Sequence, residues 1–448
     1  MKNRLRRLFG SARALLYVYF LVLIAVSTVL LALPHAWPRP GAIGALDALF
    51  TATSAAAVTG LITVNTADFT LFGQLVILVT IQLGGLGIIF FSTVFLIQPA
   101  LKMSLRNRSL IREYYVDQVD FDPARIIRSI VAVVITVQAA GALMLFAGFM
   151  TVGAERPLLN AMFHAVSAFN NAGFSLFADS LERFVGEPAI TVPVMLLVVL
   201  GGIGFVVLID LLRKSRGGRA HRLTLHTNVV LSVTVMLLVA AAAAYFVFER
   251  NGAYTGLSEG EAGMAALFQA ITPRTAGFNT VPQEALGYPA RTLTKLLMFI
   301  GGAPGSIAGG IKVTTFALVL VAALFGTNRD GDLEFAERRI PAELLAKAHA
   351  LLFKALLLLF VSVVALTISE RGLLAGRLEY SDLLFEAFSA FGTVGLSTGV
   401  TPHLSAAGRI IIIVTMFAGR VGLIAFAMPR GILAKPRVGY PTGEVIVG

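Results

Sequence analysis

The chain has 448 residues, of which 57% are hydrophobic and only 14% are charged, and its formal net charge is +11. Soluble globular domains usually carry about a quarter charged residues, so this composition excludes a protein whose only solvent is water. The chain contains no cysteine, which excludes disulfide bonds and thiolate metal sites.

Several stretches have the length and apolar character of membrane spans. They are residues 15–33, 126–150, 193–209 and 228–248. A helix needs about 20 apolar residues to cross a bilayer, and each stretch approaches or exceeds that length. The first stretch lacks a convincing signal-peptidase site and is followed by Pro34, His35 and Trp37. We therefore expect it to remain as a span of the mature protein.

Basic residues cluster in hydrophilic segments that recur after every second predicted span. The clusters lie within residues 2–13, 102–128, 213–222, 329–347 and 430–437. Short cytoplasmic loops carry an excess of Lys and Arg, so this pattern predicts a multi-pass protein of the cell membrane with both termini cytoplasmic. Nucleic-acid binding, the usual reading of a high positive charge, is much the weaker alternative.

One sequence motif, called the phrase from here on, occurs four times along the chain. It reads FTATSAAAVTGLIT from Phe50, FHAVSAFNNAGFS from Phe163, FQAITPRTAGFNT from Phe268 and FEAFSAFGTVGLS from Phe385. Each copy has a Ser or Thr in its middle and reaches a closing glycine: Gly60, Gly173, Gly277 and Gly395. A second glycine follows each closing glycine: Gly84, Gly301 and Gly419 after 24 residues, and Gly201 after 28. Such regular spacing indicates an internal repeat.

Each copy of the phrase lies between two long apolar stretches. About a dozen residues lead into each closing glycine, too few to cross a bilayer. The predicted fold class is therefore an all-α membrane protein with eight transmembrane helices and four re-entrant half-helices around a central pseudo-fourfold pore. The predicted divisions are residues 1–98 (repeat 1 with a basic N-terminal segment), 99–216 (repeat 2), 217–330 (repeat 3), 331–434 (repeat 4) and 435–448 (cytoplasmic tail).

The glycine turns predict an ion site. Non-helical backbone at membrane depth is tolerated where protein buries it or where it lines a water-filled cavity. Glycine permits positive φ and has no Cβ, so carbonyls can point at the axis. A ring of carbonyls can replace the hydration shell of K⁺. We predict that K⁺ binds at the four closing glycines, in a filter lined by Val58, Thr59 and Gly60; Asn171, Ala172 and Gly173; Thr275, Ala276 and Gly277; and Thr393, Val394 and Gly395.

Three further polar residues lie near these turns. His164, Arg274 and Glu386 are expected to brace the filter from behind. The six histidines are scattered, without the spacing of a transition-metal site, and no acid/base pair indicates an enzyme. No organic cofactor is expected in this chain.

The second span of repeat 3 reads MFIGGAPGSIAGGIKVTTFAL, residues 298–318. Glycine costs about 1 kcal/mol and proline about 3 kcal/mol in a helix relative to alanine, so the helix should break here. The predicted gate consists of Gly301, Gly302, Ala303, Pro304, Gly305, Ser306, Gly309 and Gly310. A simple proline kink is the alternative. A nucleotide-binding loop does not fit, since Ile311 separates the last glycine from Lys312 and no strand precedes. We expect this to be the only broken second span.

Arg420 stands within the last apolar stretch, where the second of two adjacent glycines occurs in repeats 1 and 2. A mid-span arginine costs at least about 2.5 kcal/mol on insertion scales and usually marks a pathway. Snorkelling to the membrane surface is the alternative. We expect Arg420 to form part of the gate, below the filter and near carbonyls of residues 301–310.

These motifs resemble the Trk/Ktr/HKT superfamily of potassium transporters over essentially the whole chain. The resemblance is carried by VTGL (58–61), NNAGF (170–174), RTAGF (274–278) and TVGLS (393–397), and the chain length favours the Ktr branch. It implies potassium uptake, with residues 301–310 obstructing the pore. Sodium-selective plant-type members have Ser at the first filter position, so Gly60 implies potassium.

The resemblance also implies partners. Members form a homodimer of pore subunits in the lipid bilayer, gated by a cytosolic KtrA-type ring that binds ATP or ADP, and Na⁺ is a possible activator. The basic loops and residues 439–448 are candidate docking surfaces. An alternating-access secondary cation transporter is the alternative function, although parallel repeats and a single broken helix favour a pore.

Overall fold

The computed structural model describes residues 12–38, 43–101, 123–217, 222–328, 330–335, 338–374 and 378–422. Within these ranges the chain is mainly helical, as predicted. A short antiparallel pair, β1 (Leu333–Phe335) and β2 (Arg338–Ile340), connects the third and fourth repeats. Most of the basic segment at 2–13, most of the loop at 102–128, and the tail at 430–448 lie outside the described residues.

The first half of the chain contains seven α-helices in its described part. They are α2 (Ala12–Ala32), α3 (Ala45–Ala56), α4 (Leu71–Leu101), α6 (Pro123–Thr151), α7 (Pro157–Phe169), α8 (Pro188–Gly202) and α9 (Phe205–Gly217). The second half continues with α10 (Leu225–Glu249), α11 (Glu259–Ile271), α12 (Tyr288–Phe299), α13 (Val313–Phe325), α14 (Ala342–Ser369), α15 (Arg371–Leu374), α16 (Tyr380–Gly392), α17 (Ala406–Phe417) and a π-helical turn, η7 (Ala418–Gly422). Short 3₁₀ turns are η1 (Pro34–Ala36), η2 (Thr66–Asp68), η3 (Glu182–Phe184), η5 (Gln283–Ala285) and η6 (Thr401–His403).

The long helices make the chain a multi-pass membrane protein. Five described segments are long and apolar enough to cross a bilayer: Ala14–Ala32, Leu71–Phe91, Ile127–Thr151, Leu225–Glu249 and Ala342–Ser369. The bent pair α8 and α9 would make a sixth. These numbers fall short of the predicted eight because the second spans of repeats 2, 3 and 4 are not continuous α-helices within the described residues.

The prediction of a single broken second span is wrong. Helices α8 and α9 meet at a bend of 103° in repeat 2. Gly204 lies at the bend with φ +88°, and the Phe205 amide donates to the carbonyl of Gly305 at 3.2 Å rather than to its own helix. The helix is therefore interrupted where the backbone of repeat 3 approaches it.

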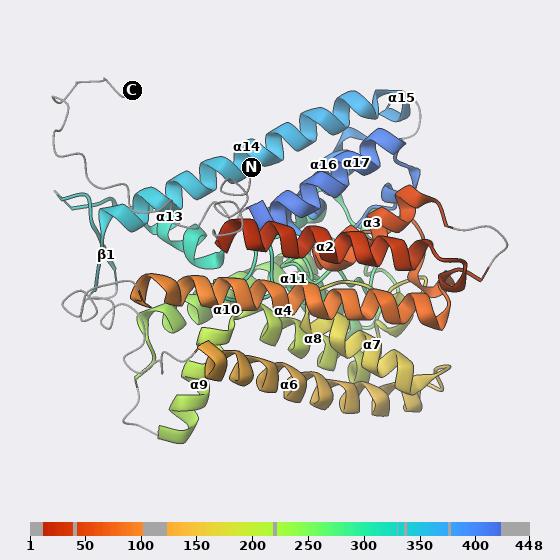
Figure 1. The fold of residues 1–448 in the computed structure, drawn as a ribbon, viewed down its shortest axis with the longest axis horizontal. Helices are drawn as coiled ribbons and strands as arrows, with labels where there is room; N and C mark the ends of the chain where they lie inside the picture. Colours follow the sequence, from red (N-terminus) through yellow and green to blue (C-terminus); the bar gives the residue numbers. More distant parts are fainter. Residues whose placement is uncertain are drawn as a thin grey trace, which may run out of the picture.

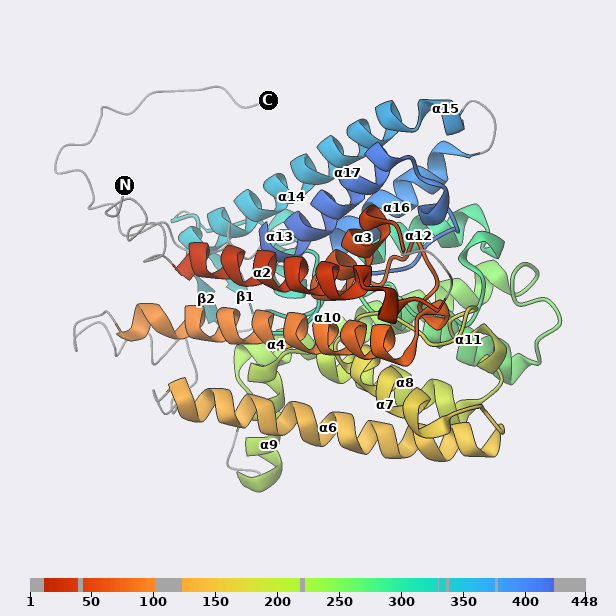
Figure 2. The same ribbon diagram turned by 45° about the vertical axis from the view of Figure 1, so that its right-hand side comes forward.

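Figure 1 shows how the repeats are arranged. Helices α2, α4 and α6 run alongside one another, while α14 and α6 lie on opposite flanks. The half-length helices α3, α7, α11 and α16 each have 12 or 13 residues. After rotation, Figure 2 shows α3 and α16 on one side of the interior and α7 and α11 on the other.

The hydrophobic core runs continuously between repeats. One cluster joins repeats 1, 2 and 3, with Phe69, Phe163 and Phe278 among its members. A second cluster joins repeats 3, 4 and 1, with Phe299, Phe391 and Phe50 among its members. Repeat 1 thus contacts both its neighbour in sequence and the last repeat, and the four repeats close into a ring.

The second glycine of each repeat has a packing role. A Cβ there would come within 3.0 Å of a carbonyl at the end of the half-length helix of the same repeat: Gly84 against Ala56, Gly201 against Phe169, and Gly419 against Phe391. Each of these carbonyls belongs to the residue four positions before the closing glycine. The regular glycine spacing therefore reflects close approach of the second span to the half-length helix. In repeat 3 the carbonyl against Gly301 belongs to Gly309 of the same loop.

Candidate ion pathway

The four glycine turns share an unusual backbone. In every repeat, φ is positive at the closing glycine and at the residue two before it: 54° and 98° at Val58 and Gly60, 55° and 69° at Asn171 and Gly173, 75° and 78° at Thr275 and Gly277, and 51° and 97° at Thr393 and Gly395. Positive φ at a non-glycine residue costs about 1–3 kcal/mol and persists only where its surroundings enforce it. Backbone that alternates in the sign of φ can turn consecutive carbonyls to one side, as a carbonyl-lined filter requires.

The closing glycines lie against one another in a ring. A Cβ added at each would come within 3.0 Å of the carbonyl oxygen just before the next closing glycine: Gly60 against Ala172, Gly173 against Ala276, Gly277 against Val394, and Gly395 against Thr59. The order follows the chain and returns from repeat 4 to repeat 1. The structure therefore brings the predicted filter residues of all four repeats together, with repeats 2 and 4 opposite each other.

The Ser or Thr in the middle of each phrase holds its turn. In repeats 1 and 4, Ser54 and Ser389 accept hydrogen bonds from the amides of Gly60 and Gly395, at 3.0 and 3.1 Å. The hydroxyls of repeats 2 and 3 instead donate to the carbonyl after the closing glycine: Ser167 to Phe174 at 2.8 Å and Thr272 to Phe278 at 2.5 Å. The ring is thus only approximately fourfold.

Two of the three expected braces lie behind the turns. The buried carboxylate of Glu386 accepts from Ser397 at 2.5 Å and from Thr401 at 2.6 Å. His164 lies at the same position of repeat 2, and its Nε2 is 2.9 Å from the Ser175 hydroxyl. Both side chains come from a half-length helix and tie it to the segment just after the closing glycine.

Arg274 is placed differently from the expectation. It lies beyond the end of α11, and its Nη2 is 3.5 Å from the carbonyl of Gly301 and 3.4 Å from the Thr234 hydroxyl. Its Nε has no hydrogen-bond partner among the described residues. Arg274 therefore contacts the broken span of repeat 3 rather than the segment after its own closing glycine.

A cluster of three amides was not recognised in the sequence. Gln82 of α4 accepts from the side chain of Asn170 at 2.8 Å and from Gln138 of α6 at 2.9 Å. This cluster ties the end of α7 to two long helices. A glutamine within an otherwise apolar span was the available signal.

Residues 300–312 form a closed loop between α12 and α13, so the alternative of a simple proline kink is excluded. The amide of Gly301 donates to Ile311 at 2.8 Å, and the amide of Val313 donates to Gly302 at 3.0 Å. The loop also docks on the break in repeat 2: the amides of Ala303 and Ile307 donate to Gly202 at 2.9 Å and to Gly201 at 3.3 Å. These contacts are between backbone atoms, which explains the need for small residues on both sides.

The loop lies directly against the ring. A Cβ at Gly309 would come within 3.0 Å of the Thr393 hydroxyl and of the Gly392 carbonyl. The predicted gate residues and one predicted filter residue are therefore neighbours. Nearly all residues of the loop are buried.

Arg420 lies against this loop. Its side chain is only 2% exposed, and Nη1 donates to the carbonyl of Ile307, so the snorkelling alternative is excluded. Nε and Nη2 have no hydrogen-bond partner among the described residues. Lys312, whose part in the site was not anticipated, donates to the neighbouring carbonyl of Ala308 at 2.5 Å. Arg420 and Lys312 thus bond to adjacent carbonyls of the loop whose Gly309 lies against the ring.

Comparisons with known proteins show the family of the chain. The TrkH family, described as "Cation transport protein", matches residues 16–436. The chain is 37% identical to the Ktr system potassium uptake protein B of Bacillus subtilis, across 97% of this chain and 96% of the relative. It is 34% identical to the potassium/sodium uptake protein NtpJ of Enterococcus hirae, across 100% and 99% of the two chains.

A solved structure has the same fold. The potassium transporter TrkH from Vibrio parahaemolyticus superposes with a TM-score of 0.70 over 91% of this chain and 83% of that one, at 19% sequence identity. The relatives are named as uptake proteins and not as enzymes, in line with the prediction from the sequence. The chain belongs to the TrkH family of cation transport proteins, and within it resembles the Ktr system potassium uptake proteins.

Proposed function

We propose that this chain takes up potassium through the ring of four glycine turns. The observation that carries the proposal is the cyclic approach of each closing glycine to the carbonyl before the next one. In this proposal the backbone of Val58–Gly60, Asn171–Gly173, Thr275–Gly277 and Thr393–Gly395 binds K⁺ in place of its water shell. The names of the Ktr-system relatives support potassium as the transported ion.

The gate of the proposed pore is the loop between α12 and α13 together with Arg420. The loop touches Thr393 of the ring, and Arg420 and Lys312 bond to its carbonyls. Fixed positive charge below a filter opposes passage of a cation, and withdrawing it would lower that barrier. A change in the loop that moved these carbonyls would also move both cations.

The proposed topology has eight spans and four re-entrant half-helices, in the four repeats given above. Both termini and the basic clusters lie on the cytoplasmic side of the cell membrane. Continuous helices account for five spans, and the interrupted second spans of repeats 2, 3 and 4 account for the remaining three. The half-length helices fit this scheme because 12 or 13 residues cannot cross a bilayer.

The proposed assembly is a homodimer regulated by a cytosolic KtrA-type ring that binds ATP or ADP. The phrase "Ktr system" in the names of relatives supports a multicomponent system. Activation by Na⁺ belongs to the same proposal, and the name of the Enterococcus relative pairs potassium with sodium.

The second break, between α8 and α9, is the observation that favours alternating access as a second candidate. Transporters of that kind build midplane sites from discontinuous helices. Here, however, the break bonds to the loop of repeat 3 through three backbone hydrogen bonds, at Ala303, Ile307 and Phe205. The break in repeat 2 and the loop of repeat 3 therefore form one unit beside the ring. This arrangement favours a gated pore over an alternating-access transporter, in which two halves would move against each other.

Growth rescue of a potassium-uptake-deficient bacterium tests the proposal. The wild-type chain, coexpressed with a KtrA-type subunit, should restore growth at low potassium, and Gly173→Ser should not. Rescue by the wild-type chain alone would contradict the regulatory part. Full rescue by Gly173→Ser, at equal membrane abundance, would contradict the role of the ring.

A further inference from the structure

Arg–Asp ion pairs join the repeats at two of their junctions. Arg291 pairs with Asp382 at 3.2 Å between repeats 3 and 4, and Arg409 pairs with Asp47 at 2.7 Å between repeats 4 and 1. Each arginine lies 14 residues after a closing glycine, and each aspartate lies 13 residues before the next one. The two pairs are therefore equivalent by the internal symmetry.

The junction between repeats 1 and 2 has amides at these positions. Gln74 takes the place of the arginine, and Asn160 takes the place of the aspartate. They do not bond to each other: the side-chain nitrogen of Gln74 donates to Phe69 at 3.1 Å, and that of Asn160 donates to Glu155 at 2.6 Å. The Oε1 atom of Gln74 has no hydrogen-bond partner among the described residues, although the side chain is only 7% exposed.

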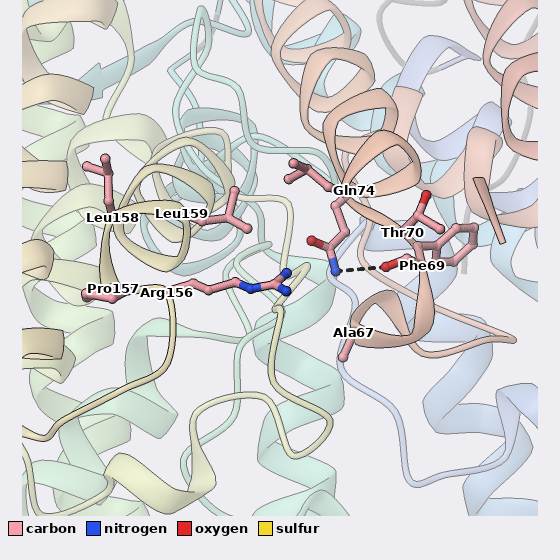
Figure 3. A pocket seen from close by; sticks show the side chains of 9 residues that line it. Ala67, Phe69, Thr70, Gln74, Arg156, Pro157, Leu158 and Leu159 are labelled. Carbon is pink, nitrogen blue, oxygen red and sulfur yellow. Dashed lines mark hydrogen bonds between the residues drawn. The ribbon is translucent and has the colours of Figure 1, made fainter. Parts of the chain in front are cut away.

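A hollow of about 730 Å³ opens at this junction. Its lining residues are Ala67, Phe69, Thr70, Leu71, Gln74, Arg156, Pro157, Leu158 and Leu159. Figure 3 shows the Gln74 oxygen turned toward the side occupied by Leu159 and Arg156, and the Arg156 side chain extended toward Gln74. Arg156 is exposed and makes no capping hydrogen bond at the start of α7. The hollow thus offers one cationic donor and one buried, unused acceptor.

The position of the hollow indicates what fills it. Leu71 begins the span Leu71–Phe91, so the hollow lies at the boundary between the apolar layer and the headgroups. Leu71 and Leu158 are 51% and 60% exposed on its rim, as lipid-facing side chains are. A ligand here meets lipid tails on one side and polar groups on the other.

We infer that this hollow binds the headgroup of a phospholipid that carries an N–H or O–H donor, such as phosphatidylethanolamine or phosphatidylglycerol. The phosphate would lie at Arg156 and at the N-terminal end of α7, where positive charge favours an anion. The headgroup donor would bond to Oε1 of Gln74, and the acyl chains would cover Leu71 and Leu158. The inference rests on the proposed topology, which puts the site in the outer leaflet.

Lipid titration of the purified, delipidated full chain in detergent tests the inference. Short-chain phosphatidylethanolamine and phosphatidylglycerol should bind the wild type about tenfold more tightly than phosphatidylcholine, whose headgroup has no donor. Arg156→Gln should weaken the binding of all three lipids by about tenfold. Gln74→Met should lower the affinity for phosphatidylethanolamine and phosphatidylglycerol to that for phosphatidylcholine. The affinity for phosphatidylcholine itself should not change.

Arg250→Gln is the matched control, because it removes a positive charge from a loop outside the hollow. It should bind all three lipids as the wild type does. If Gln74→Met fails to fold, Gln74→Leu provides the same test, since it also removes the acceptor oxygen and adds no charge. Equal binding of the donor lipids by wild type and Arg156→Gln would overturn the inference. Binding of glycerol phosphate as tight as that of the intact lipids would also overturn the inference, because the hollow would then be a site for free anions.

These measurements involve no ion flux, so they separate this site from the proposed transport function. Normal lipid binding with no potassium uptake would contradict the transport proposal alone. Normal uptake with no selective lipid binding would contradict the lipid site alone.

Discussion

Gly395 and Thr59 join the two ends of the repeat array. A Cβ at Gly395 would come within 3.0 Å of the carbonyl oxygen of Thr59, although the two residues belong to the last and the first repeat. This approach closes the ring that the other three closing glycines begin. The ring is therefore a product of the whole chain, and a side chain at any of the four positions would push two repeats apart.

Gly395→Ala should abolish rubidium uptake into proteoliposomes. Gly256 offers a matched control, because its φ of +92° is close to the +97° of Gly395 and nothing lies within 4 Å of a Cβ there. Both substitutions carry the backbone cost of a left-handed alanine, about 1–2 kcal/mol. Only Gly395→Ala adds a clash with a neighbouring repeat. Equal uptake by the two variants would show that the close approach of Gly395 to the neighbouring repeat is not needed for transport.

Arg420→Ala should change the potassium dependence of uptake. The substitution removes a buried cation that bonds to the carbonyl of Ile307, so the barrier below the ring should fall and the maximal flux should rise. Initial rates of rubidium uptake over a range of concentrations measure this change. Arg250→Ala, which removes an exposed cation paired with Glu259, is the control. Kinetics identical to wild type at every concentration would exclude Arg420 from the gate.

Glu386→Ala should lower the preference for rubidium over sodium. Without the carboxylate, the hydroxyl of Ser397 and the buried hydroxyl of Thr401 lose their acceptor, at a cost of about 1–3 kcal/mol for the buried group, and the filter turn of repeat 4 is free to relax. Glu386→Gln keeps an acceptor oxygen at the same place and should retain most of the preference. The flux ratio of the two ions is the measurement. An unchanged ratio in Glu386→Ala would mean that the brace does not shape the filter.

The ion pair between Asp47 and Arg409 should couple repeats 1 and 4. Both side chains are less than a quarter exposed, so the coupling energy from a double-mutant cycle should be on the order of 1 kcal/mol. Thermal unfolding of Asp47→Asn, Arg409→Gln and the double variant measures it. Strict additivity of the two single effects would mean that the pair contributes nothing to the closure of the ring.

The repeat made much of this arrangement predictable from the sequence. Four phrases that end at Gly60, Gly173, Gly277 and Gly395 contain enough information to predict which residues meet, and MFIGGAPGSIAGG contains enough to predict a broken helix. Arg420 was predictable for a different reason, since an arginine within an apolar stretch needs a polar partner.

Other features depend on contacts between distant segments, which local patterns do not report. The bend at Gly204 arises because the Phe205 amide bonds to Gly305, about 100 residues later in the chain. In the sequence, Gly201 was interpreted only as one of the second glycines of the internal repeat, so the second broken span was missed. Arg274 was assigned to its own turn, but its guanidinium extends to Gly301 instead. Lys312 was considered only as part of a rejected nucleotide-binding loop.

In the proposed function, the ring of glycine turns selects potassium. Its most direct test is tracer flux into proteoliposomes loaded with potassium, comparing rubidium with sodium for the wild type and for Gly60→Ser. We expect the wild-type chain to accumulate rubidium and reject sodium, and Gly60→Ser to admit sodium. Equal rubidium and sodium flux through the wild type, or unchanged selectivity in Gly60→Ser, would contradict it.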